Sequence, residues 1–144
     1  MDKQSFYRDA RGDLTGPLAG VRVLDATTAW SGPMAGCLLA DLGADVVRIV
    51  PPGDPGLRWP PHLPGTSARS FAEETVNRNK RSVAVDLRQA AGAEVFLRLV
   101  RDADVVLENF KPGTLDGWGV GYRQCAAVKP DLVFVSISGW GQFG

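Results

Sequence analysis

The chain has 144 residues, of which 44% are hydrophobic and 22% are charged, and its 16 basic side chains equal its 16 acidic ones. This length suffices for one domain with a substantial buried core. Nucleic acids and anionic membranes favour proteins with a basic excess, so the balanced charge predicts neither as a partner.

Cysteine and histidine are too sparse to indicate a metal site. Cys37 and Cys125 fall on predicted apolar helix faces without a CxxC pair, and His62 is the only histidine. We therefore expect buried reduced thiols and no metal. No stretch has the roughly 18 continuous apolar residues of a membrane span, and the polar beginning lacks a signal-peptide core, which predicts a cytoplasmic protein.

The chain divides into a polar segment and a periodic one. Residues 1–16 show no periodicity and are predicted to form a flexible arm, whereas residues 17–144 form the domain. In chain order, the pattern predicts a strand at 21–24, a helix at 33–42, strands at 44–50 and 82–87, a helix at 89–101, a strand at 104–108, a helix at 122–128 and a strand at 132–137. Residues 51–70 are too rich in proline and glycine for either element and predict a long loop.

The alternation of continuous aliphatic strands with helices predicts an α/β fold, a Rossmann-like doubly wound parallel sheet covered on both faces. Ligands of such sheets bind outside the carboxyl ends of the strands. The first of these ends leads into the turn TTAWSGP at 27–33, which lacks the GxGxxG fingerprint. Trp30 stands where a pyrophosphate would lie, so NAD and FAD are disfavoured, while the helix start at Gly32 can receive an anion or an acyl carbonyl. The alternative for Trp30 is packing against the neighbouring loop.

Two further clusters lie near strand ends. Arg78, Lys80 and Arg81 precede a predicted strand and form either a phosphate-recognition site or a solvated basic face. Residues 108–113, ENFKPG, combine an amide, an aromatic ring and a cation that could hold an adenine nucleotide. The hydrolase and nucleotide motifs GxSxG, HExxH and GxxxxGKS are absent from the sequence.

Four motifs occur in order from residue 17 to residue 144: GPLAGVRVLDATTAWSGPMAGCLLADLGADVVRI, VNRNKRSVAVDLR, ADVVLENFKPGTLDGWGVGY and PDLVFVSISGWGQFG. Together they resemble the amino-terminal part of the large domain of the family III, or CaiB/BaiF-type, CoA-transferases. The resemblance implies a Rossmann-like CoA-binding domain in an enzyme that moves CoA from an acyl-CoA thioester to a carboxylic acid. It also implies an interlocked homodimer or a complementary carboxyl-terminal chain.

The resemblance also implies residue roles. Ala29, Trp30 and Ser31 would line the CoA and thioester region, Leu87 and Arg88 would lie along the nucleotide, and Asn109, Phe110 and Lys111 would cradle adenosine and pantetheine. The basic cluster stays ambiguous, partly structural and partly an attraction for CoA phosphates. Two departures remove charge near the nucleotide, at Val50-Pro51 and at Gly117-Trp118, so phosphate recognition is expected to be weaker or moved to Arg58 or Arg88.

No residue of this chain matches the catalytic aspartate of the family, which lies downstream of the SGWGQFG motif. Asp25, Asp86 and Glu108 match structural positions instead. We therefore expect a fragment that is incomplete at its carboxyl end, leaves its last strand uncovered and is inactive alone. The alternatives are a fragment of a 2-methylacyl-CoA racemase or epimerase, and a non-catalytic acyl-CoA-binding module.

Overall fold

The computed structural model describes residues 16–54, 56, 59–62, 64–65 and 70–143. The strands are β1 (Arg22–Ala26), β2 (Asp45–Val50), β3 (Arg81–Ala84), β4 (Val105–Glu108) and β5 (Val133–Ser136). The helices are α2 (Ser31–Asp41), α3 (Phe71–Asn77), α4 (Ala90–Val100), α5 (Thr114–Gly117) and α6 (Tyr122–Val128). Apart from Gly16, the predicted arm lies outside the described residues.

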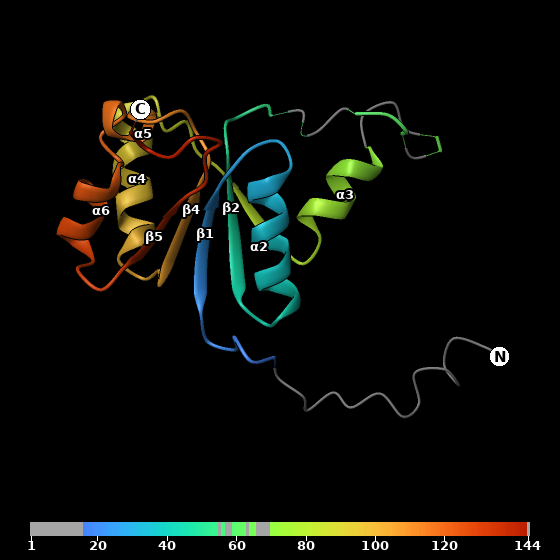
Figure 1. Cartoon of the computed structure of the whole chain (residues 1–144), viewed down its shortest axis with the longest axis horizontal. Coiled ribbons are helices and arrows are strands. Elements are labelled where there is room, and N and C mark those ends of the chain that lie inside the picture. The colour runs from blue at the N-terminus through green and yellow to red at the C-terminus, as the bar shows by residue number, and fades with distance from the viewer. Residues whose placement is uncertain (1–15, 55, 57–58, 63, 66–69, 144) are drawn as a thin grey trace.

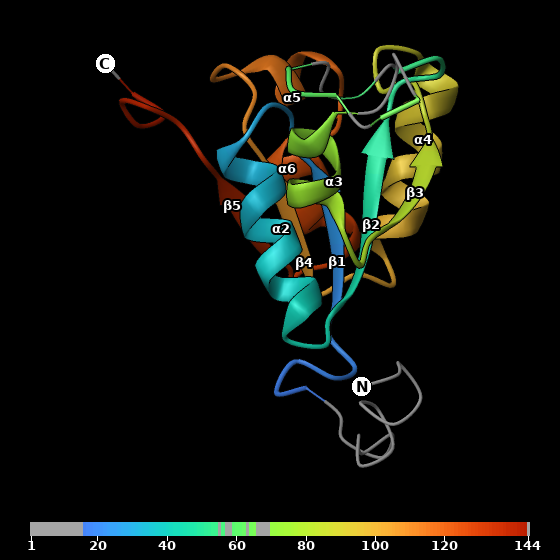
Figure 2. The ribbon, with the colours of Figure 1, turned by 90° about the vertical axis from the view of Figure 1, so that its right-hand side faces the viewer.

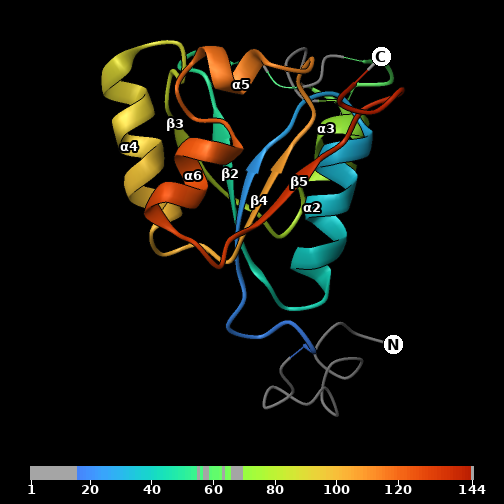
Figure 3. The same ribbon diagram turned by 60° about the vertical axis from the view of Figure 1, so that its left-hand side comes forward.

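The five strands form one parallel sheet in the order β3-β2-β1-β4-β5, which confirms the predicted α/β, Rossmann-like fold. Helices α2 and α3 lie on one face, and α4 and α6 lie on the other (Figures 1 and 3). Figure 2 shows the strands running toward the end that carries α5 and the segment after β2. This is the carboxyl edge, where ligands of doubly wound sheets bind.

Burial on both faces explains why the central strands are continuously aliphatic. In β1, Val23 packs into the cluster on the α2 side and Leu24 into the larger cluster on the α4 side. In β4, Leu107 and Val106 divide in the same way. The register aligns Leu24 with Val106, so these alternating side chains meet across neighbouring strands.

The helices differ from the prediction at the start of α2 and at α3 and α5, neither of which was predicted. Helix α2 begins two residues before Pro33 and ends before Gly43, which adopts a φ of +100° as expected of a glycine at a helix terminus. Helix α3 was not predicted, although its start carries a capping-box pattern. The Ser70 side chain accepts a hydrogen bond from the Glu73 amide at 3.1 Å, the arrangement typical of S-x-x-E at a helix start.

Strand β5 forms one edge of the sheet. Its Val133 and Val135 are 56% and 36% exposed. In the described part of the chain, every helix is too short or too polar to cross a bilayer.

Candidate functional site

A pocket of about 500 Å³ opens at the carboxyl edge of the sheet. Its walls come from segments that follow four strands. They comprise Ala26 at the end of β1 and Thr28 after it, Ile49 of β2 and Pro51 to Asp54 after that strand, Val85 to Arg88 after β3, and Phe110 and Trp118 after β4. The wall is mainly apolar and aromatic, which suits the flat ring of a ligand held by stacking.

A second hollow of about 530 Å³ lies beside the first and is lined by Ser31, Asn109, Phe110, Lys111, Pro112, Ile137, Ser138 and Gly139. Phe110 lines both spaces. Its ring packs edge-on against Trp118 with centroids 5.2 Å apart, and its amide donates to Oε2 of Glu108 at 2.9 Å. The two hollows are therefore neighbouring parts of one edge, joined at a fixed aromatic ring.

The predicted CoA-contacting residues all lie at this edge but divide among separate hollows. Leu87 and Arg88 line the first pocket together with Phe110, whereas Ser31, Asn109 and Lys111 line the second. Ala29 lines a third cavity of about 160 Å³. Their contact with a ligand stays a prediction.

Trp30 is 43% exposed and stacks on Trp59, with ring centroids 6.2 Å apart and planes 9° from parallel. The alternative considered for Trp30, packing on the neighbouring loop, is thus present. Trp59 and Trp118 were both missed as candidates. The departure at Gly117-Trp118, which removes charge from the motif, was the signal available for Trp118.

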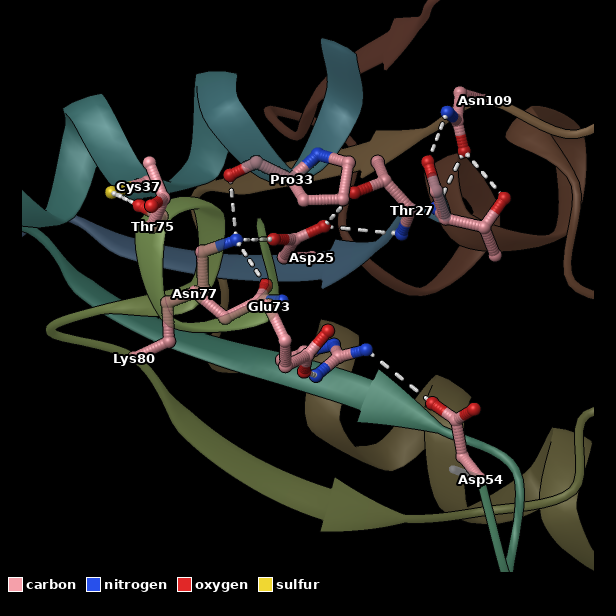
Figure 4. Close-up of polar contacts among 12 residues, drawn as sticks. Asp25, Thr27, Pro33, Cys37, Asp54, Glu73, Thr75, Asn77, Lys80 and Asn109 are labelled. Carbon is pink, nitrogen blue, oxygen red and sulfur yellow. Dashed lines mark hydrogen bonds and ion pairs between the residues drawn. The ribbon is translucent and has the colours of Figure 1, made fainter. Parts of the chain in front are cut away.

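Asn109 fixes the turn between β1 and α2. Its Oδ1 accepts from the Thr28 amide at 2.7 Å, and its Nδ2 donates to the Thr28 carbonyl at 2.8 Å (Figure 4). Both ends of the side-chain amide are therefore engaged by one backbone residue. The next residue, Ala29, has a φ of +62°, a left-handed conformation that is unfavourable for alanine and must be imposed by its surroundings.

Beneath the same turn lies a buried ion pair between Lys80 and Asp25. The Lys80 Nζ lies 2.6 Å from Oδ2 of Asp25, and both side chains are 1% exposed. The ammonium also donates to the Pro33 carbonyl at 2.6 Å and to Oδ1 of Asn77 at 2.9 Å (Figure 4). Asp25 Oδ1 accepts from the Thr27 amide at 3.1 Å and from the Thr27 hydroxyl. Burial lowers the pKa of Lys80, and the attraction of Asp25 opposes that shift.

The other two cations of the basic cluster face away from the pocket. Arg81 binds both carboxylate oxygens of Asp45, at 3.0 and 2.6 Å, and these residues begin β3 and β2 at the amino edge of the sheet. Arg78 pairs with Asp41 at the end of α2 and holds the pKa of that carboxyl below its usual value. These placements correct the hypothesis that the cluster recognises a phosphate, because ligands of such sheets bind at the opposite edge.

Arg88 supplies a cation to the wall of the first pocket. Its Nε donates a hydrogen bond to Oδ1 of Asp86 at 2.7 Å, and its Nη2 donates one to Oδ2 at 3.0 Å. These hydrogen bonds lower the pKa of Asp86. The Arg88 side chain is 64% exposed, so it can turn toward a ligand at little cost. Arg58, the other cation considered for phosphate recognition, lies outside the described residues.

Both thiols are free and buried, as predicted. Burial raises the pKa of Cys125 to about 12 and raises that of Cys37 as well, so neither is a nucleophile near neutral pH. His62 lies in the segment after β2, as expected, where it pairs with Ser70 in an isolated antiparallel β-bridge. Among the described residues, no three His, Cys, Asp or Glu side chains gather in a group that could hold a metal ion.

The parallel sheet, its open carboxyl edge and a first turn without the dinucleotide fingerprint define a Rossmann-like domain. The sequence model of CoA-transferase family III matches residues 18–144, and the chain therefore belongs to that family. It is 43% identical over 130 residues to the succinyl-CoA–D-citramalate CoA-transferase of Chloroflexus aurantiacus, covering 89% of this chain and 32% of the relative. It is 38% identical to the human succinyl-CoA:glutarate CoA-transferase over 130 residues, with 89% and 29% covered.

Solved structures of similar sequence share the fold. A CaiB/BaiF family protein from Brucella suis superposes with a TM-score of 0.82 at 39% identity, over 91% of this chain and 35% of that protein. The protein Rv3272 of Mycobacterium tuberculosis gives a TM-score of 0.83 at 39% identity, over 90% and 36%. The chain thus spans about a third of the length of the relatives that it matches.

Proposed function

We propose that this chain supplies the CoA-binding part of a family III CoA-transferase, an enzyme that moves CoA from an acyl-CoA thioester to a carboxylic acid. The observation that carries the proposal is the pair of hollows at the carboxyl edge, which meet at Phe110. CoA is a long ligand with a flat adenine at one end and a thioester at the other, so it suits two adjoining spaces. Family membership supports the same ligand.

Each hollow has a role in this proposal. Leu87 and Phe110 pack against the adenosine in the first pocket, and Arg88 exchanges part of its bond with Asp86 for a CoA phosphate. The pantetheine arm then passes Phe110 toward Ser31, Asn109 and Lys111. The thioester reaches the Ala29 to Ser31 turn, where the Ser31 and Gly32 amides at the start of α2 have no acceptor within the helix and can stabilise a developing oxyanion.

The reacting carboxylate is proposed to come from outside the described residues. Asp25 is paired with Lys80, Asp86 with Arg88, and Glu108 accepts from the Phe110 amide. These three carboxylates are therefore occupied in holding the edge together. An aspartate outside these residues, in the same chain or in a complementary chain, would carry the covalent steps. An interlocked homodimer would complete the site.

In those steps the aspartate attacks the donor thioester, giving a mixed anhydride and releasing CoA thiolate. The thiolate attacks the aspartyl carbonyl, which forms the aspartyl-CoA thioester and releases the donor acid. The acceptor carboxylate attacks that thioester, giving a second anhydride and thiolate. The thiolate then takes the acceptor acyl group and regenerates the aspartate. The residues described here bind and orient CoA during this sequence and hold no covalent intermediate.

Calorimetric titration of the chain tests the binding half of the proposal, with CoA as ligand and NAD as comparator. We expect saturable binding of CoA and none of NAD. Binding of NAD in preference to CoA, or a folded chain that binds neither, would contradict the assignment.

The catalytic half is tested by mixing succinyl-CoA with a dicarboxylic acid and following new acyl-CoA by mass spectrometry. This donor is chosen because the names of several relatives specify succinyl-CoA. The chain alone is expected to exchange no CoA, and a complementary carboxyl-terminal chain is expected to restore exchange. Uptake of deuterium at the α-carbon of a 2-methylacyl-CoA without exchange would favour a racemase instead, and CoA binding that no complement makes productive would favour a non-catalytic module.

A further inference from the structure

The turn between β1 and α2 is held from two sides by residues distant in sequence. On one side, Asn109 forms two hydrogen bonds with the backbone of Thr28 across 81 residues. On the other, Asp25 binds Thr27, and Lys80 joins Asp25 to the Pro33 carbonyl in the first turn of α2. The turn is therefore fixed both where it leaves the strand and where it enters the helix.

This double attachment explains a backbone conformation that the local sequence does not favour. Ala29 lies between the two attachments with its φ of +62°. A left-handed conformation is unfavourable for alanine and persists only where the surrounding contacts determine it. Trp30, the next residue, is the N-cap of α2 and Ser31 is the first residue of that helix, so the conformation of Ala29 sets the direction of the helix start.

The ammonium of Lys80 is placed to act on the turn and not on a ligand. Its side chain is 1% exposed, and its three donors have three acceptors, on β1, α2 and α3: Asp25, Pro33 and Asn77. A buried ammonium without such acceptors would be strongly unfavourable, so the three elements are held together at one point. Close contact of α2 makes this possible, because Gly36 has no side chain to collide with Asp25.

We propose that Lys80 is a positioning residue: through Asp25 and Pro33 it holds the 27–31 turn in the conformation that receives the thioester end of CoA, without touching the ligand. The inference rests on the proposed function for its ligand, whereas its claim about the turn is independent of any ligand. A residue that merely stabilised the fold would affect all parts of the sheet alike. A positioning residue affects the turn more than the rest.

The test compares Lys80→Met with Arg81→Met in the whole chain. Both variants remove one cation from the same segment, but the Arg81 side chain is 70% exposed and lies at the opposite edge of the sheet. Amide hydrogen exchange reads the turn directly, at the Thr27 and Thr28 amides, and titration with CoA reads the site. Exchange is measured in the free protein, so it decides the claim about the turn even if the wild-type chain binds no CoA.

In Lys80→Met we expect exchange at the turn to quicken by about tenfold or more while β1 and β4 amides keep their rates, and CoA to bind about tenfold more weakly. Arg81→Met should match the wild type in both. If Lys80→Met does not fold, the double variant Asp25→Asn with Lys80→Met replaces it. This variant removes both buried charges and keeps an acceptor for Thr27, but it still lacks the donor to the Pro33 carbonyl. We expect the same faster exchange at the turn and the same weaker CoA binding. Wild-type exchange at the turn in a folded variant, or equal quickening throughout the sheet, would overturn the proposal.

Discussion

Replacing Gly36 by alanine should destabilise the protein, although the same change in an open helix is favourable. A methyl group at this position would lie 2.5 Å from Oδ2 of Asp25 and 3.3 Å from Nζ of Lys80. Both neighbours are buried and fixed by several hydrogen bonds, so neither can move aside without loss. The change therefore acts on the buried ion pair from the helix side.

The magnitude follows from two opposing effects. Alanine gains about 1 kcal/mol over glycine in a helix interior. Overpacking a filled site costs about 1–3 kcal/mol, and partial separation of a buried ion pair adds to that cost. The net expectation is a loss of about 2 kcal/mol in the free energy of unfolding.

Urea denaturation near neutral pH measures this difference as a lower midpoint at an unchanged slope. Gly117→Ala is the matched control, because a methyl group there meets no atom within 4 Å and should be neutral or slightly stabilising. A Gly36→Ala variant as stable as the wild type, or more stable, would refute the close packing of α2 on the ion pair.

Three further predictions concern other parts of the chain. Because the pKa of Cys125 is raised from 9.0 to about 12, the thiol loses its proton more readily in the unfolded chain. Its contribution to the free energy of unfolding is therefore complete below pH 9.0 and decreases by up to about 1.4 kcal/mol per pH unit above it. Urea curves for wild type and Cys125→Ala should accordingly converge as pH rises, and parallel pH profiles would contradict this. Trp59→Ala should abolish the near-ultraviolet circular dichroism of the stacked Trp30–Trp59 pair while changing the free energy of unfolding by less than about 0.5 kcal/mol, and an unaltered spectrum would argue against the stack. Arg88→Met should weaken CoA binding by about three- to tenfold and reduce its dependence on salt in calorimetric titrations, and an unchanged salt dependence would exclude a phosphate contact.

The order of elements was predictable because burial leaves a clear pattern in central parallel strands. Val23 and Leu24 face opposite cores, so both must be apolar, and the same holds for Val106 and Leu107. Helix α3 was missed although it has the same seven-residue length as α6, which was predicted. The Ser70 capping pattern was the stronger signal there.

The carboxyl-edge rule locates the candidate site, and it also places the basic cluster away from that site. Residues that precede a parallel strand lie at its amino end, so the position of Arg81 before the 82–87 strand already indicated the edge away from the ligand. The ion pair between Lys80 and Asp25 was harder to predict from the sequence. Its members are 55 residues apart, and their contact depends on how α2 and α3 pack on the sheet. The two hydrogen bonds between the Asn109 side chain and the Thr28 backbone likewise require that β1 and β4 lie side by side.

The central claim, that the carboxyl edge binds CoA, is tested most directly by amide NMR of the chain titrated with CoA. The account predicts shift changes concentrated at residues 26–31, 85–88 and 109–111, with the amino edge at Asp45 and Arg81 unaffected. Saturable changes centred on the amino edge, or none anywhere in a folded chain, would contradict it.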